Sequence, residues 1–177
     1  MVATRPRGAL RQLVSFPNPV NEVAARVVAG GVVVMGIVAI AVPEPWLLVV
    51  LTYGFWARAL TGPKLSPLGL LATRVVAPRL APAKPVPGPP KRFAQGMGVV
   101  FSTTSLVLWL GFGEHLASMV FTGMLCGAAS LESFAGICIG CRIFSLLMRR
   151  GLIPESVCES CADLSLRHPS LSAAPRG

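Results

Sequence analysis

Charged side chains are scarce in this chain. They make up 13% of its 177 residues, whereas hydrophobic residues make up 53%, and the mean hydropathy is +0.68. Soluble domains carry about 25% charged residues. The composition therefore excludes an ordinary soluble domain and indicates a membrane protein whose core lies in lipid.

Acidic side chains are the scarcest, with 7 Asp and Glu against 16 Lys and Arg, so that the formal net charge is +9. The basic residues fall between apolar runs and are not interleaved with aromatic side chains on one face, so the sequence predicts no nucleic-acid partner. Within the apolar runs only Arg26, Arg58 and Glu132 are charged, all near an end. This pattern argues against a channel or a transporter.

Long apolar runs predict an all-α integral membrane protein with four transmembrane helices and short interfacial helices. About 20 residues cross about 30 Å of hydrocarbon. No small-residue cleavage site follows the first run, so we expect that run to be retained. The second run is short, and Trp46 and Arg58 would anchor its two ends in the interface. The predicted spans are 23–42, 45–60, 93–112 and 115–135.

The connections between the spans alternate between tight turns and one long loop. Pro43-Glu44-Pro45 and Gly113-Glu114-His115 leave room only for antiparallel hairpins. We expect Asn18-Pro19 to start the first helix, and six prolines between residues 78 and 90 to form an extended linker. The predicted units are a basic tail at 1–17, a transmembrane domain at 18–150 with interfacial segments at 67–77 and 137–150, and a C-terminal tail at 151–177.

Two small-residue patterns lie inside the spans. The hydroxyls of Ser102-Thr103-Thr104-Ser105 are expected to bond mostly back to their own helix. Gly123 and Gly127 form a G-x3-G pattern that would let another helix approach closely. Cys126, which lies between them, is interpreted as a small buried apolar residue.

Lysine and arginine are distributed unevenly along the chain. The two tight turns contain none, whereas the N-terminal tail, the loop from Arg58 to Arg92 and the segment from Arg142 onward hold all but Arg26, itself near the tail. The positive-inside rule then predicts a multi-pass cell-membrane protein with both termini in the cytoplasm. Thiols on that side are normally kept reduced.

Four of the five cysteines form two C-x-x-C pairs, Cys138/Cys141 and Cys158/Cys161, separated by sixteen residues. This spacing fits a structural zinc site made of four thiolates. It equally fits a redox or sulfur relay, in which Cys138 and Cys141 react and Cys158 and Cys161 accept the disulfide by exchange. A third interpretation treats all four as small buried residues. Residue types and spacing leave these alternatives open.

Several segments together resemble a known family. These are Asn21-Glu22 with Arg26, the segment 54–67 (G-F-W-A-R-A-L-T-G-P-K-L-S-P), the segment 131–141 (L-E-S-F-A-G-I-C-I-G-C) and the late C-x-x-C pair. Over about residues 18–165 the chain resembles the bacterial membrane proteins grouped as domain of unknown function 4395, although Leu65 stands where an aromatic residue is expected.

The resemblance implies a small polytopic membrane protein and brings no assigned activity or certain cofactor. It favours a thiol-disulfide or sulfur relay with a soluble thioredoxin-like or sulfurtransferase protein over a zinc-binding scaffold. Both readings involve Cys138, Cys141, Cys158 and Cys161.

Overall fold

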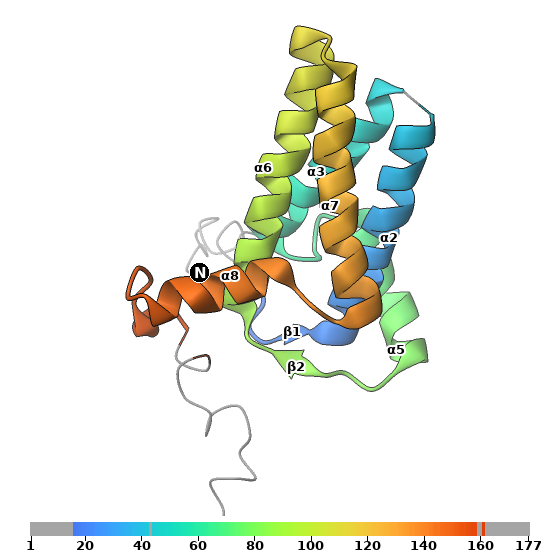
Figure 1. The fold of residues 1–177 in the computed structure, drawn as a ribbon. Helices are drawn as coiled ribbons and strands as arrows, with labels where there is room; N and C mark the ends of the chain where they lie inside the picture. The colour runs from blue at the N-terminus through green and yellow to red at the C-terminus, as the bar shows by residue number, and fades with distance from the viewer. Residues whose placement is uncertain (1–15, 43, 159–160, 162–177) are drawn as a thin grey trace, which may run out of the picture.

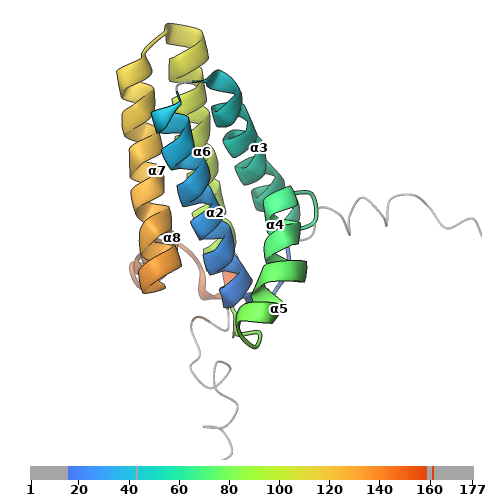
Figure 2. The same ribbon diagram turned by 90° about the vertical axis from the view of Figure 1, so that its right-hand side faces the viewer.

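The part of the chain that the structure describes is helical apart from one short β-ribbon, which confirms the all-α part of the predicted fold class. The computed structural model describes residues 16–42, 44–158 and 161. Most of the predicted basic tail and most of the predicted C-terminal tail lie outside these residues. Four long helices stand side by side (Figures 1 and 2): α2 (Glu22–Ala41), α3 (Pro45–Thr61), α6 (Gly88–Phe112) and α7 (His115–Ala135).

These helices form two antiparallel hairpins. Helix α2 packs on α3 and α7, and α6 packs on the same two helices, so the four enclose a common core. Both hairpin turns lie at one end of the bundle, here called the turn end, and the shorter elements lie at the opposite end, the base (Figure 1). Val32, Leu51, Phe55 and Leu125 form the largest buried cluster.

Helices α2, α6 and α7 are long and apolar enough to cross a membrane. Helix α3 has 17 residues, fewer than such a crossing usually takes. Its outward side is nevertheless apolar, with Trp46, Val50 and Tyr53 exposed. Apolar residues on both the inner and the outer side of a helix are typical of a membrane span.

The close helix contacts occur at glycines other than the predicted pair. A Cβ on Gly36 of α2 would lie 2.2 Å from Cys126 Sγ, and one on Gly98 of α6 would lie 2.2 Å from the Phe55 ring. Gly123 and Gly127 have no atom within 4 Å of a built Cβ. Among the described residues no helix of this chain packs on them, because they lie on the outer side of α7. Their approach to another helix therefore stays a prediction.

Hydroxyl groups join the helices near the middle of the bundle. Ser105 Oγ lies 2.8 Å from both Ser118 Oγ and Thr122 Oγ1, and Ser105 is only 1% exposed. Trp56 Nε1 donates to Thr103 Oγ1 at 3.2 Å. Only Ser102 donates within its own helix, so the expectation of self-bonding is wrong for Ser105. The reason is that Ser105 faces two hydroxyls of α7.

The start of the first helix differs from the prediction. Asn21 caps α2, with its Oδ1 accepting from Val23 N–H at 3.0 Å. Asn18 Oδ1 instead accepts from Gly88 N–H at 3.0 Å. The chain stays extended between these residues because β1 (Val20–Asn21) pairs antiparallel with β2 (Pro85–Val86). The proline-rich linker is therefore partly a strand, and its last two prolines lie in the first turn of α6.

The loop between α3 and β2 contains one continuous helical segment. It consists of α4 (Pro67–Leu71), a π-helical turn η1 (Ala72–Val76) and α5 (Ala77–Leu80), and it packs on α2 near the base (Figure 2). Arg58 is buried beneath it at 5% exposure and donates to Gln95 Oε1 and Ser66 Oγ. The prediction that Arg58 anchors α3 in the interface is therefore wrong.

Candidate dithiol site

Cys138 lies where α7 gives way to the last long element of the base. Gly136 ends α7 with φ +68°, a left-handed conformation that glycine adopts at low cost. Helix α8 (Ile139–Arg149) then begins, with Cys138 as its N-cap, and lies across the base of the bundle (Figure 1). Cys138 Sγ accepts a hydrogen bond from Cys141 N–H at 3.3 Å. The N-terminal turn of a helix stabilises negative charge, and a cysteine at this position therefore has its thiolate form favoured.

The two sulfurs of the first pair face each other. Cys141 Sγ lies 2.6 Å from Cys138 Sγ and donates to it. Cys138 is buried at 8% exposure, whereas Cys141 is half-buried. The structure thus brings together the two residues that were predicted as a reactive pair, with both thiols unbonded.

Glycine and aromatic packing hold this pair in place. A Cβ on Gly140 would lie 2.6 Å from Ala94 Cα, so only glycine allows α8 to approach α6 this closely. Phe144 of α8 is buried against Phe93 of α6, with ring centroids 5.7 Å apart. Gly140, one of the two residues between the cysteines, therefore sets their distance from the bundle.

An ion pair lies beside the dithiol. Lys91 of α6 and Glu132 of α7 are 2.5 Å apart and both largely buried. The hydrogen bond from Cys141 lowers the pKa of the Cys138 thiol, and the Lys91 charge adds to this effect against burial and Glu132. The same hydrogen bond, together with burial, raises the pKa of Cys141. The pKa values of the two thiols are thus shifted in opposite directions.

The second pair is in a different state. Cys158 and Cys161 form a disulfide after the short 3-10 turn η2 (Glu155–Val157), and Cys158 is buried. The described residues include all four cysteines, and among them no three Cys, His, Asp or Glu side chains are grouped as metal ligands would be. The structure joins each pair internally and does not gather the four sulfurs; zinc binding by these four stays a prediction.

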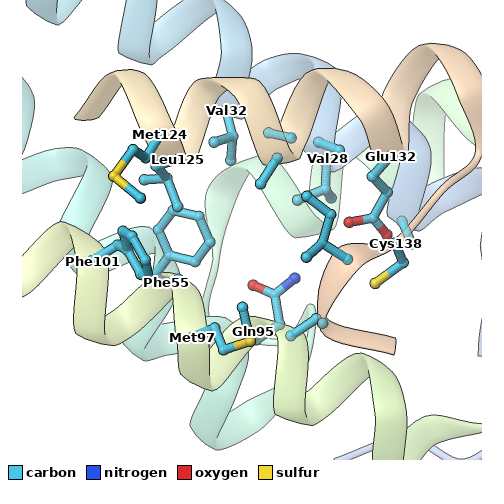
Figure 3. A pocket seen from close by; sticks show the side chains of 18 of the residues that line it. Val28, Val32, Phe55, Gln95, Met97, Phe101, Met124, Leu125, Glu132 and Cys138 are labelled. Atoms are coloured by element: carbon cyan, nitrogen blue, oxygen red, sulfur yellow. The ribbon is translucent and has the colours of Figure 1, made fainter. Parts of the chain in front are cut away.

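Cys138 lines two separate hollows. One is a cavity of about 300 Å³ inside the bundle, with Cys138 and Glu132 at one end and Phe101 and Met124 at the other (Figure 3). The second is a groove of about 780 Å³ on the base, which both Cys138 and Cys141 line. Cys138 therefore borders both the interior of the bundle and the base, whereas Cys141 borders the base groove alone of these two hollows.

Sequence reasoning missed the residues that surround the dithiol. Lys91 was counted only as a loop charge, and Glu132 only as a charge near a span end. They are 41 positions apart, so no local pattern connects them. Arg26, too, was counted only as a charge near a span end. It donates to the carbonyls of Ser133 and Phe134 at the end of α7, at 3.2 and 3.0 Å. This contact ties α2 to the segment that leads into Cys138.

One comparison with known proteins gave a match. A family model described as a domain of unknown function (DUF4395) matches residues 20–149. Comparisons with curated proteins and with solved structures gave no match. The matched region covers the four long helices and all of α8, and the chain therefore belongs to the DUF4395 family.

Proposed function

We propose that this chain is a four-span cell-membrane protein that exchanges disulfides with a soluble partner through Cys138 and Cys141. The observation that carries the proposal is the unequal pair of thiols, in which Cys138 accepts from both Cys141 Sγ and Cys141 N–H. A thiol with a lowered pKa beside a protonated second thiol is the arrangement that thiol-disulfide exchange uses.

The exchange proceeds in two steps. The Cys138 thiolate attacks one sulfur of the partner's disulfide, which forms a mixed disulfide and releases the partner's other sulfur as a thiolate. Cys141 then loses its proton and attacks Cys138, which forms the Cys138–Cys141 disulfide and releases the partner's second thiolate. Two electrons pass to the partner, so that the partner is reduced. Of its two released thiolates, one can take the proton from Cys141 and the other takes a proton from water in the groove.

The base groove is suited to a soluble protein with an acidic surface around its disulfide. Lys84, Arg142 and Arg149 line the groove along with the dithiol, whereas Glu22 is its acidic side chain and pairs with Lys84 at 2.9 Å. The family resemblance points to thioredoxin-like or sulfurtransferase proteins as such partners. Cys158 and Cys161 serve as a second dithiol that exchanges electrons with the first.

The orientation follows from charge. The turn end carries no lysine or arginine in its two connections, and the base carries Arg26, Lys84, Lys91 and Arg142. We infer that the base and both termini face the cytoplasm. A test starts from a variant in which every native cysteine is replaced and adds one cysteine at residue 83 or residue 113. Labelling of each by a membrane-impermeant maleimide is compared in intact and opened cells. Labelling of residue 83 from outside the intact cell contradicts the orientation.

A trapping experiment tests the chemistry. Protein in lipid nanodiscs is reduced and mixed with 5,5′-dithiobis(2-nitrobenzoate), and the products are identified by mass. Cys141→Ser is expected to accumulate the mixed disulfide on Cys138. Cys138→Ser, which lacks the attacking sulfur, is expected to form none at this pair. Cys126→Ala, which changes a buried residue of α7, is the matched control and should behave like the wild type.

Other outcomes distinguish the alternatives. One zinc ion per chain that is lost in every Cys→Ser variant of the two pairs supports the structural zinc site. One added sulfur atom on Cys138 after incubation with a sulfurtransferase supports sulfur relay. Absence of any mixed disulfide in the folded Cys141→Ser variant contradicts the exchange proposal.

A further inference from the structure

The cavity inside the bundle has a polar end and an apolar body. Figure 3 shows Cys138 and Glu132 at one end, with Gln95 pointing into the space beside them and Phe55, Phe101 and Met124 farther along. Gln95 Oε1 accepts from Arg58 Nε at 3.0 Å, which directs its amide nitrogen toward the cavity as a donor. An apolar pocket with few convergent polar groups is the usual form of a small-molecule site.

The cavity reaches the outer surface of the bundle. Met124 of α7 and Ile143 of α8 line it and are also 55% and 37% exposed. The surface around this opening is apolar, since Val120 and Leu131 of α7 are exposed as well. If α6 and α7 cross the membrane, the opening faces lipid and not water, so its ligand must be lipid-soluble.

The volume limits the size of the ligand. A protein cavity of about 150 Å³ holds benzene, which has six heavy atoms. A cavity of about 300 Å³ accommodates roughly twice as many, the size of a substituted benzoquinone or a naphthoquinone ring. A ring carbonyl at the polar end can accept from the Gln95 amide while the ring lies next to Cys138 Sγ.

We propose that this cavity binds the ring of a lipid-soluble quinone, which oxidises the Cys138–Cys141 dithiol. The inference rests on the proposed exchange function and names the second redox partner of the same dithiol. The soluble partner docks in the base groove, the quinone enters from the bilayer, and Cys138 lines both sites. The two exchange steps run in reverse when the partner arrives as a dithiol: the partner reduces the Cys138–Cys141 disulfide and is itself oxidised. The regenerated dithiol is then oxidised by the quinone, so that electrons pass from the partner to the membrane quinone pool.

The reaction balances as a two-electron transfer. The Cys138 thiolate adds to a ring carbon, and the adjacent oxygen takes up one proton. Cys141 then loses its proton and attacks the sulfur of Cys138. The carbon–sulfur bond breaks, its electron pair moves into the ring, and the second ring oxygen is protonated. The dithiol becomes a disulfide and the quinone becomes a hydroquinone. The second proton comes from Cys141 and the first from the base groove.

The test uses reduced full-length protein in nanodiscs without oxygen, with tetramethyl-1,4-benzoquinone as the probe. Hydroquinone formation is followed by absorbance, and the Cys138–Cys141 disulfide by mass after thiol alkylation. We expect one hydroquinone per disulfide formed. Ala128→Phe fills the cavity from α7 and should slow this reaction by about tenfold or more, because an added ring excludes the ligand. Val107→Phe, at an exposed position of α6 that does not line the cavity, should leave the rate unchanged.

A soluble disulfide provides the distinguishing measurement. Reaction with 5,5′-dithiobis(2-nitrobenzoate) through the base groove should be equal in the wild type and Ala128→Phe. If the soluble disulfide reacts and the quinone does not, or if Ala128→Phe oxidises the dithiol with quinone at the wild-type rate, the quinone site is wrong and the exchange function stands. If neither reagent reacts, both proposals fail.

Two further measurements keep the test decisive if Ala128→Phe does not fold. Ala25→Leu fills the same cavity from α2 and should show the same selective loss. In Cys141→Ser, tetramethylhydroquinone, which cannot oxidise the thiol, should protect Cys138 from alkylation in a saturable manner. Protection that does not saturate, or that is equal in Cys141→Ser/Ala128→Phe, contradicts binding in the cavity.

Discussion

The two C-x-x-C pairs have the same spacing and different surroundings. Cys138 caps α8, receives two hydrogen bonds from Cys141 and lies between the Lys91–Glu132 pair and a groove. Cys158 and Cys161 follow a three-residue 3-10 turn and are bonded to each other. Identical spacing therefore says little about reactivity, because the pKa of a thiol depends on helix termini, charges and burial that the motif itself does not specify.

The largest expected difference between the pairs is in the exchange rate that remains after one cysteine of each pair is replaced by serine. Cys138→Ser should reduce exchange with a soluble disulfide by about a thousandfold or more, as removal of a nucleophile does in covalent catalysis. Cys158→Ser should leave the first exchange step near the wild-type rate. Stopped-flow measurement of both variants checks this. Equal losses in the two would show that the pairs act as one site.

A substitution that displaces α8 from α6 should have the next largest effect on exchange at Cys138. Gly140→Ala places a Cβ against the Ala94 backbone and should destabilise the protein by about 1 to 3 kcal/mol. We also expect exchange at Cys138 to slow by about tenfold, because small displacements of a reacting group are costly. Gly96→Ala in α6 meets no atom within 4 Å and is the matched control, expected to be neutral or slightly stabilising. Denaturant unfolding and exchange kinetics measure both.

Removing one or the other charge of the Lys91–Glu132 ion pair should shift the pH profile of Cys138 in opposite directions. Lys91→Met removes a charge that lowers the pKa of Cys138, so the pKa of Cys138 should rise. The thiolate fraction at neutral pH then falls, and exchange should slow by about fivefold, or about 1 kcal/mol. Glu132→Gln removes a charge that raises the pKa of Cys138, so its profile should move to lower pH. The Lys91, Glu132 and Cys141 groups are the ones that act on Cys138 here.

Thiolate absorbance against pH measures these shifts directly. Arg92→Met, at the neighbouring exposed position, is the control and should leave the profile unchanged. Shifts of the same sign in Lys91→Met and Glu132→Gln would mean that the two charges act through structure and not through the field at Cys138.

The smallest effect on exchange should come from the hydroxyl cluster in the middle of the bundle. Ser105→Ala leaves Ser118 and Thr122 without their shared partner and should cost about 1 to 2 kcal/mol of stability. The exchange rate should not change, since this cluster lies far along α6 from the base. Thr104→Val serves as the control for stability, measured by thermal unfolding in detergent. A change in exchange rate would couple the middle of the bundle to the dithiol.

The sequence by itself determined the all-helical class, the long apolar helices with their two tight turns, and the pairing of cysteines at i and i+3. These features are local or periodic, and apolar runs of sufficient length, prolines at turns and short cysteine spacings can be recognised in one segment at a time.

Only the tertiary structure decided what surrounds each C-x-x-C pair. The N-cap at Cys138 depends on where α7 ends, the approach of α8 depends on Gly140 against Ala94, and the nearby charges come from residues 41 positions apart. Gly123 and Gly127 looked like a helix contact and face outward, while Gly36 and Gly98 make the contacts. The physical reason is that the direction in which a helix face points, and hence what each side chain meets, is set by packing between distant segments.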